Sequence, residues 1–222
     1  MLEAITTRRL TSAVLPLILL SMGVVAQAQG IRVITPAQQK ELLADTRTEM
    51  SGAENPDVTI IEYFDYNCPF CRELAPDLQA LLKDDHGVAV VHKEWPIFGG
   101  VSVYAARAAL AAGFQGKYLV AHETLINGPR LAQEDQVDAE LKRAGVDMDR
   151  LARDRTSHAA QIDTLLKRND REAHALNIRG TPGILVDREV LPGTVNLKGL
   201  KQLVESARHR RRSPQDAPGP DK

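Results

Sequence analysis

The chain has 222 residues, a formal net charge of −1 and only two cysteines, Cys68 and Cys71. Two thiols can make at most one bond within the chain, which excludes a scaffold of several disulfides, and the length suffices for a core that needs no such staple. The balance of 28 basic against 29 acidic side chains gives no global field that would indicate nucleic acid as a partner.

Residues 1–28 have the pattern of a secretory signal peptide. Arg8 and Arg9 precede an apolar run from Ala13 to Val25, and the Ala-Gln-Ala sequence that ends at residue 28 resembles a signal peptidase site. A transmembrane anchor is the alternative, but Pro16 interrupts the run, which is short for a bilayer that needs ~20 apolar residues. We therefore expect export to the periplasm, an oxidising compartment in which disulfides form and persist.

Residues 29–57 are expected to form one short helix and a linker. Thr35 is a suitable N-cap, a proline follows it in the first turn, and Gln38 occupies the capping-box position, so a helix is expected from here to about Thr48. The glycine, asparagine and proline of residues 50–56 then predict a linker.

The next elements predict a βαβ unit. Residues 58–64 are rich in β-branched and aromatic side chains and predict a buried strand, and residues 88–94 predict a second one. Between them, apolar residues recur at helical spacing from Pro69 to about Lys83. A helix of about fifteen residues between two strands is typical of a right-handed crossover with parallel strands.

The rest of the chain predicts a helical block followed by a return to strands. Residues 101–176 show no convincing strand and are expected to form an inserted helical domain. Its helix-like segments are at residues 105–112, 118–126, 133–144 and 148–175. Short strands are expected at residues 184–186 and near Val190, and a last helix from Leu197 to about His209. Residues 58–100 and 177–210 would then form one α/β domain, and the proline-containing residues 211–222 a disordered tail.

The Cys68-Pro69-Phe70-Cys71 sequence lies where the first predicted strand gives way to the helix. Cys68 falls at the N-cap and Pro69 at the first helical position, where a missing N–H costs nothing. Unpaired N–H groups and the positive helix end stabilise a thiolate at Cys68 and lower its pKa. Cys71 lies one turn later on the same side. We therefore expect Cys68 to be an exposed nucleophile and Cys71 a buried resolving thiol.

Two other interpretations of the cysteine pair stay open. Two thiolates could hold a soft ion such as Cu(I), although tetrahedral zinc would need two further ligands and the six histidines show no paired ligand spacing near the cysteines. An inert structural disulfide is disfavoured, because so small a ring adds little loop-closure stabilisation. A Cys-x-x-Cys beside a βαβ pattern favours redox chemistry.

The chain resembles the DsbA-like family of bacterial envelope thiol-disulfide oxidoreductases. The resemblance rests on two motifs, the EYFDYNCPFC sequence of residues 62–71 and the GTPG sequence of residues 180–183, and it extends over residues 58–209. It implies an α/β, thioredoxin-like fold with an inserted helical domain, disulfide exchange with other proteins, and no bound cofactor. The chain departs from the best-known DsbA pattern because Phe70 stands where that pattern has a histidine.

The resemblance also implies roles for three residues outside the cysteine pair. Pro182 matches the family's cis-proline, which faces the cysteines and leaves the backbone of Thr181 free to pair with a substrate strand; an ordinary trans proline is the alternative. Glu62 matches a buried acid beneath the resolving cysteine. Such an acid would have a raised pKa and could relay a proton to or from Cys71, whereas on an alternating strand it would point to solvent.

Aromatic residues near the cysteines are candidates for contacts with substrate. Phe70, between the two cysteines, is the best candidate for an exposed apolar contact, and Trp95 and Phe98 could line the same groove. Such a surface suits a protein that binds unfolded chains.

These features predict a periplasmic oxidase that introduces disulfides into unfolded or cysteine-containing exported proteins. A DsbB-like membrane partner would reoxidise it, whereas the reverse direction would need a DsbD-like electron donor. Only residues 29–57 precede the catalytic domain, which is little for an oligomerising stalk, so we expect a monomer. The alternatives are an isomerase or reductase of the copper-sensitivity-suppressor type and a copper-binding envelope protein.

Overall fold

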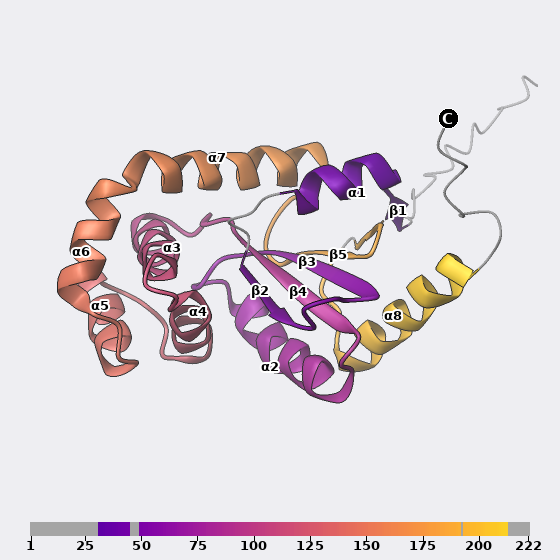
Figure 1. The fold of residues 1–222 in the computed structure, drawn as a ribbon, viewed down its shortest axis with the longest axis horizontal. Coiled ribbons are helices and arrows are strands. Elements are labelled where there is room, and N and C mark those ends of the chain that lie inside the picture. Colours follow the sequence, from indigo (N-terminus) through magenta and orange to yellow (C-terminus); the bar gives the residue numbers. More distant parts are fainter. Residues whose placement is uncertain (1–30, 45–48, 192, 213–222) are drawn as a thin grey trace, which may run out of the picture.

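The computed structural model describes residues 31–44, 49–191 and 193–212. The predicted signal peptide, residues 1–28, and the part of the predicted tail after residue 212 lie outside the described residues. The described chain forms a mixed sheet with helices on both faces and a group of further helices at one end (Figure 1). None of the described helices is both long and apolar enough to cross a membrane.

The sheet has six strands in the order β1-β6-β5-β3-β4-β2. The strands are β1 (Arg32–Val33), β2 (Glu49–Gly52), β3 (Val58–Phe64), β4 (Val88–Glu94), β5 (Gly183–Val186) and β6 (Glu189–Val190). β3 and β4 are parallel, as the βαβ pattern predicted, and every other pair is antiparallel. All residues of β3 and β4 are buried, so the apolar residues in these strands do not alternate with exposed polar ones. The strands also bury polar side chains, among them Glu62 on β3 and His92, Lys93 and Glu94 at the end of β4.

Eight helices surround the sheet in the described part of the chain. They are α1 (Pro36–Leu43), α2 (Pro69–Asp84), α3 (Gly100–Gly113), α4 (Tyr118–Asn127), α5 (Glu134–Arg143), α6 (Met148–Ser157), α7 (Ala159–Ala175) and α8 (Leu197–Arg212). α2 and α8 cover one face of the sheet, α1 and α7 the other, and α3 to α6 gather at one end (Figure 1). The five helices α3–α7 lie between β4 and β5, so the predicted helical insertion is present.

The alternation of side chains along β3 joins three cores. Ile60 packs under α2 and α8, whereas Ile61 and Tyr63 pack on the opposite face with residues of α1 and α7. Phe64, at the end of the strand, belongs to a third core that contains both cysteines and continues into the helical insertion. The cysteines therefore lie where the sheet and the insertion meet.

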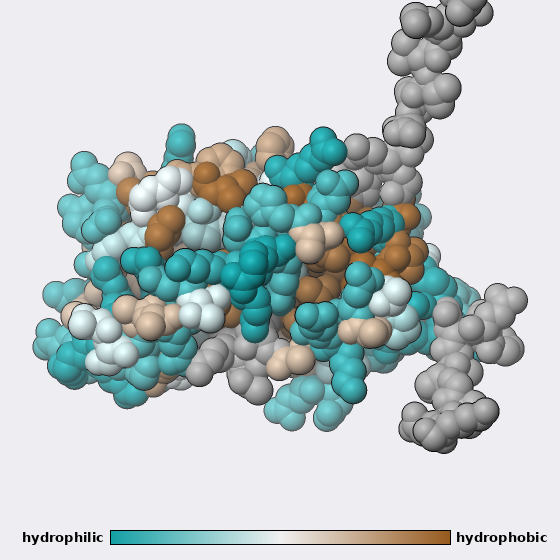
Figure 2. Space-filling view, turned by 90° about the horizontal axis from the view of Figure 1, so that it is seen from above, coloured by the Kyte–Doolittle hydropathy of each residue, from teal (hydrophilic) through white to brown (hydrophobic). Residues whose placement is uncertain are grey.

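The outer surface of α7 and α1 is mostly hydrophilic (Figure 2). This is expected for amphipathic helices whose apolar sides are turned toward the sheet. A brown, apolar area remains at the end of the molecule where α1 and β1 lie, and the exposed apolar residues of that region are Ile31, Val33 and Leu43.

Several predicted boundaries differ from the structure. The predicted linker of residues 50–56 contains most of β2, which pairs with the edge of β4 although its own sequence has no strand pattern. The capping box of Thr35 is present, but α1 ends at Leu43 and not near residue 48. The last helix extends to Arg212, past the predicted end at His209.

The segment 148–175 is two helices and not one. His158 ends α6 and precedes α7, and its ring stacks on Phe114 with 3.7 Å between the ring centroids. The residue at the break thus contacts the C-cap residue of α3, a contact that local periodicity does not reveal.

Candidate active site

The two cysteines lie at the start of α2. Cys68 is the N-cap, with an extended backbone (φ −69°, ψ 119°), and Pro69 takes the first helical position, where its fixed φ is favourable. The Cys68 carbonyl accepts a hydrogen bond from the N–H of Arg72 at 3.1 Å. Cys71 follows one turn later, and its thiol hydrogen-bonds the sulfur of Cys68.

The loop before β5 lies against the thiol of Cys68. The Thr181–Pro182 peptide bond is cis, the geometry that the family resemblance implied. Cys68 Sγ donates a hydrogen bond to the Thr181 carbonyl oxygen at 3.1 Å. Thr181 Oγ1 is buried and has no hydrogen-bond partner among the described residues, so this hydroxyl is free to donate to a thiolate on Cys68.

The surroundings of Cys68 lower its pKa to about 6 from an ordinary value of 9.0. The largest cause is the hydrogen bond from the Cys71 thiol, and the Thr181 side chain and the backbone N–H groups of Cys71 and Phe70 add to it, while burial opposes them. Each of these donors favours the charged form of the sulfur. Cys68 is therefore largely a thiolate at neutral pH.

The environment of Cys71 acts in the opposite direction. Burial raises the pKa of the Cys71 thiol strongly, and the hydrogen bond to Cys68 and the charge of Glu62 raise it further. Cys71 thus stays protonated under conditions in which Cys68 is charged. The pair therefore consists of one thiol that ionises readily and one that stays protonated.

The expectation that Cys68 is exposed is wrong. Cys68 and Cys71 both have 0% of their surface exposed. The physical reason is the loop of Thr181 and Pro182, which packs against the sulfur of Cys68 and closes the side that the helix N-terminus leaves open.

Glu62 is buried on β3 and does not point to solvent. Only 3% of the residue is exposed, and its carboxylate lies 3.4 Å from Nδ1 of His92 on β4. His92 in turn contacts Ser51 on β2, with 2.9 Å between Nε2 and Oγ. Since the charge of Glu62 raises the pKa of Cys71, the acid and the resolving thiol are electrostatically coupled.

A second histidine, His122 on α4, packs against His92. Their ring centroids are 4.1 Å apart, and Tyr66 Oη lies 3.4 Å from Nδ1 of His122. Burial lowers the pKa of His122 well below its ordinary value, and the neighbouring His92 lowers it further. Glu62 and both histidines line a cavity of about 40 Å³. No group of three or more metal-ligating side chains occurs in the described part of the chain.

This histidine pair was not predicted from the sequence. His92 and His122 lie on different elements, and only the packing of α4 against the sheet brings them together. The buried strand position of His92 within an apolar run was the one signal that the sequence offered.

Asp65 holds a loop beside the cysteines. Its buried carboxylate accepts hydrogen bonds from the backbone N–H groups of Ile97 and Phe98 at 2.7 and 2.9 Å, from the Asn67 N–H at 2.8 Å and from the Ser102 hydroxyl at 2.7 Å. One carboxylate therefore holds both the segment just before Cys68 and the loop between β4 and α3.

The predicted aromatic contacts divide into two groups. Phe70 and Phe98 are 55% and 51% exposed, so both present apolar surface to solvent. Trp95 does not join them: it is 5% exposed, it packs in the core between the sheet and α7, and its Nε1 donates to Asp170 at 2.9 Å. Its strand-end position turns the indole inward, so the expectation that Trp95 lines an exposed groove is corrected.

Two side chains of the cysteine segment bind the helical insertion. Asn67 exchanges two hydrogen bonds of 3.0 Å with the backbone of Leu131. Arg72 donates to the carbonyl oxygens of Tyr66 at 2.9 Å and Leu125 at 3.0 Å, and also to that of Gly128. The insertion is therefore attached directly to the segment that carries the cysteines.

A family model and two solved structures are similar to this chain over most of its length. The family model described as a DSBA-like thioredoxin domain matches residues 59–205. A thioredoxin-like oxidoreductase from Silicibacter pomeroyi has 36% sequence identity and a TM-score of 0.73, over 77% of this chain and 97% of that one. A periplasmic thioredoxin-like protein from Salmonella enterica serovar Typhimurium has 26% identity and a TM-score of 0.68, over 79% of this chain and 98% of that one.

The curated relatives are much longer proteins. A Na(+)/H(+) antiporter NhaA 1 from Salinispora arenicola is 27% identical over 164 residues, which are 72% of this chain and 25% of the relative. A Na(+)/H(+) antiporter NhaA 3 from Salinispora tropica is 30% identical over 169 residues, with the same coverage. The chain thus spans about a quarter of the length of these relatives.

Proposed function

The chain belongs to the DSBA-like thioredoxin family and is a thiol-disulfide oxidoreductase, and we propose that it introduces disulfides into exported proteins. Its fold is thioredoxin-like with the helical insertion α3–α7, as the sequence resemblance predicted. The observation that carries this proposal is the lowered pKa of Cys68, because a stabilised thiolate favours the reduced form of the enzyme and makes its disulfide more oxidising.

In this proposal each residue of the site has one role. Cys68 exchanges disulfides with the substrate, and Cys71 is the resolving thiol. Thr181 pairs its backbone with a substrate strand, and Pro182 leaves that backbone free. Glu62, whose charge is felt at Cys71, exchanges a proton with that thiol.

The reaction begins with the disulfide between Cys68 and Cys71. A substrate thiolate attacks Sγ of Cys68, the bond between the two cysteines breaks, and Cys71 leaves with the electron pair and takes up a proton. A second substrate thiolate then attacks the substrate sulfur of the mixed disulfide and expels Cys68 as a thiolate. The substrate loses two electrons and two protons, and the enzyme is reduced by the same two electrons.

The stabilised thiolate favours this direction. A sulfur with a low pKa is a good leaving group, so the mixed disulfide resolves toward release of Cys68. The same donors stabilise the reduced enzyme relative to the oxidised one and make its disulfide more oxidising. A pKa of about 6 lies within the range of about 3.5 to 7.5 found for reactive cysteines at helix N-termini.

The surface near the site suits an unfolded polypeptide. Phe70 and Phe98 expose aromatic rings close to the cysteine segment, and Ile97 is 45% exposed beside them. Exposed apolar side chains of this kind favour extended, partly unfolded chains over folded partners.

The setting of the reaction is proposed from the sequence. Residues 1–28 would direct the chain to the periplasm, residues 58–100 and 177–210 would form the catalytic domain around the insertion 101–176, and the protein would act as a monomer without a cofactor. A DsbB-like membrane protein would reoxidise it. The periplasmic description of the Salmonella relative supports this location.

Mixed-disulfide trapping tests the assignment of the two cysteines. Cys71→Ser is expected to accumulate mixed disulfides with reduced, unfolded substrate proteins in the presence of an oxidant, because the resolving thiol is missing, whereas Cys68→Ser is expected to trap none. Equal trapping by the two variants would refute the assigned roles.

The reduction potential of the pair tests the direction. A potential above that of the periplasmic substrates supports the oxidase, whereas a strongly reducing potential together with a stable dimer or trimer in sedimentation would indicate an isomerase or reductase supplied by a DsbD-like donor. Mass spectrometry of the purified protein would show the loss of two protons for the disulfide form. A bound metal with reduced thiols would instead support a copper-binding protein.

A further inference from the structure

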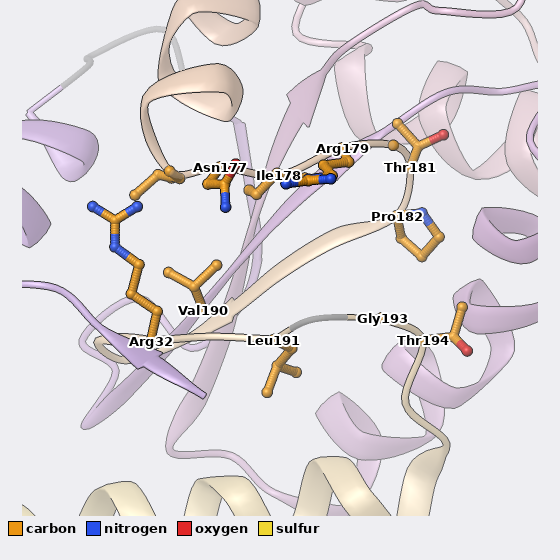
Figure 3. A pocket seen from close by; sticks show the side chains of 12 residues that line it. Arg32, Asn177, Ile178, Arg179, Thr181, Pro182, Val190, Leu191, Gly193 and Thr194 are labelled. Carbon is orange, nitrogen blue, oxygen red and sulfur yellow. The ribbon is translucent and has the colours of Figure 1, made fainter. Parts of the chain in front are cut away.

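A cavity opens beside the loop that packs against Cys68. Its volume is about 440 Å³, and Figure 3 shows it between β1, the loop before β5 and the segment after β6. Its lining residues are Arg32, Leu176, Asn177, Ile178, Arg179, Gly180, Thr181, Pro182, Val190, Leu191, Gly193 and Thr194. The cavity therefore shares Thr181 and Pro182 with the active site.

The charge of this cavity is positive. Its lining contains two guanidinium groups, those of Arg32 and Arg179, and no carboxylate. Arg32 donates one hydrogen bond of 3.3 Å, to the backbone oxygen of Ala175, and Arg179 makes no hydrogen bond or ion pair with any residue that the structure describes. Both side chains are exposed to solvent.

The two acids of the neighbouring β5–β6 hairpin, Asp187 and Glu189, are already occupied. Asp187 is paired with Arg211, and Glu189 with Arg210 at 2.7 Å. Neither carboxylate is available to neutralise Arg32 or Arg179, so the cavity that shares Thr181 and Pro182 with the active site keeps two unneutralised cations.

The arrangement of the two arginines frames the opening. In Figure 3 the Arg32 side chain rises from β1 on one side, and Arg179 lies along the loop on the other, with Thr181 and Pro182 beyond it. Ile178, Val190 and Leu191 supply apolar walls between them. An apolar cavity with two guanidinium groups suits a side chain that has a short aliphatic stem and a carboxylate.

We propose that this cavity binds an acidic side chain of the substrate polypeptide, about two residues from the cysteine that reacts with Cys68. The proposal rests on the proposed disulfide exchange and names a preference within it. Arg179 precedes Thr181 by two positions, the chain bends at Gly180 between them, and all three residues line the cavity. A substrate strand paired with Thr181 advances ~3.3 Å per residue, so a residue about two positions from its cysteine lies over the neighbouring cavity that Arg179 lines.

The chemistry of arginine favours this ligand. A guanidinium group binds a carboxylate through two parallel N–H···O bonds, and its charge does not titrate at physiological pH. An exposed ion pair of this kind corresponds to about a twofold to fivefold change in a rate or equilibrium constant. The preference should therefore be modest and should weaken with salt, since charges are screened over about 10 Å at 0.1 M ionic strength.

Peptides with a single cysteine provide the test. The cysteine is joined as a disulfide to a neutral 2-thiopyridyl group, and glutamate, glutamine or lysine stands two positions before or two positions after it. In the Cys71→Ser protein the Cys68 thiolate attacks the peptide sulfur, the peptide–pyridyl disulfide breaks, and 2-thiopyridone leaves with the electron pair. Its absorbance gives the rate of the exchange.

The glutamate peptide is expected to react about fivefold faster than the glutamine peptide at one of the two positions, and the lysine peptide more slowly than either. In Arg179→Gln and Arg32→Gln the ratio of glutamate to glutamine rates should fall toward one, whereas Arg153→Gln, an exposed arginine of α6, should preserve it. Equal rates for the three peptides, or an unchanged ratio in both cavity variants, would overturn the proposal. Failure of the glutamine peptide to react at all would instead count against the proposed exchange activity, and thermal unfolding would show that the variants are folded.

Discussion

The sulfur of Cys68 lies 3.1 Å from the backbone oxygen of Thr181, although 113 positions separate the two residues. This contact joins the start of α2 to the loop before β5. It places the thiol, the donor groups of the first helical turn and the Thr181 side chain around one atom, and these groups together lower the pKa of Cys68.

The first prediction concerns the thiolate of Cys68. Titration of the reduced protein, followed by the ultraviolet absorbance of the thiolate, should show one transition with a midpoint near pH 6. The second thiol should stay protonated well above pH 9, because burial and the neighbouring charge raise the pKa of Cys71. A wild-type midpoint near the ordinary value of 9.0 would contradict the geometry of the site.

The same titration separates the causes of the shift. Cys71→Ala removes the largest donor to Cys68, so its midpoint should move upward toward 9.0. Cys71→Ser keeps a hydroxyl donor at that position and should move less. If both variants titrate like the wild type, the Cys71 thiol does not stabilise the thiolate.

The second prediction concerns Asp65. Asp65→Asn replaces one acceptor oxygen by an N–H₂ group. This group would face the backbone N–H groups of Ile97 and Phe98, which now donate hydrogen bonds to the carboxylate. Loss of these charge-assisted bonds, with half-buried donors left facing an N–H₂ group, should lower the free energy of unfolding by about 3 kcal/mol. Denaturant unfolding measures this change, and amide exchange should accelerate at Ile97 and Phe98.

Asp138→Asn is the matched control. Among the described residues Asp138 accepts hydrogen bonds from the Tyr104 hydroxyl alone, and both side chains are half-buried, so the substitution should cost less than about 1 kcal/mol. Similar losses in the two variants would mean that Asp65 does not hold the loop beside the cysteines.

The third prediction concerns the attachment of the helical insertion. The Arg72 guanidinium donates to three carbonyl oxygens, of Tyr66, Leu125 and Gly128, and a lysine ammonium cannot reach all three in this planar arrangement. Arg72→Lys should therefore lower the free energy of unfolding by about 2 kcal/mol and increase proteolysis near residue 128. Arg171→Lys, an exposed position of α7, should change neither measurement.

The sequence was informative where local patterns determine the structure. The strands β3 and β4, the helix α2 and its N-terminal Pro69 were all predicted, because burial on both faces and helical spacing leave a clear pattern in consecutive residues. The capping box at Thr35 was predicted for the same reason.

The features that were missed depend on partners distant in the sequence. β1 and β2 are short edge strands whose hydrogen bonds come from β6 and β4. The burial of Trp95 requires α7 to cover the sheet, and the burial of Cys68 requires the Thr181 loop. Composition and spacing do not encode these contacts.

The last prediction concerns the pH dependence of stability and the buried ring of His122. Its pKa is lowered in the folded protein, first by burial and then by His92. Between its folded pKa and the unfolded value of about 6.5, the unfolded chain binds a proton at this position and the folded chain does not. Stability from this residue is therefore present above pH 6.5 and is lost as the pH falls, by up to about 1.4 kcal/mol per pH unit.

His122→Phe removes this titration while keeping a ring against Phe64 and Tyr118. Denaturant unfolding of the oxidised protein from pH 7.5 to 5, in which Cys68 does not titrate, should therefore show a smaller loss of stability in this variant than in the wild type. His86→Gln, at an exposed position, should retain the wild-type slope. If the imidazole of His122 is neutral in the folded protein, the wild type must lose more stability than His122→Phe as the pH falls. Parallel pH profiles for the two proteins would therefore show that protonation of His122 does not oppose folding.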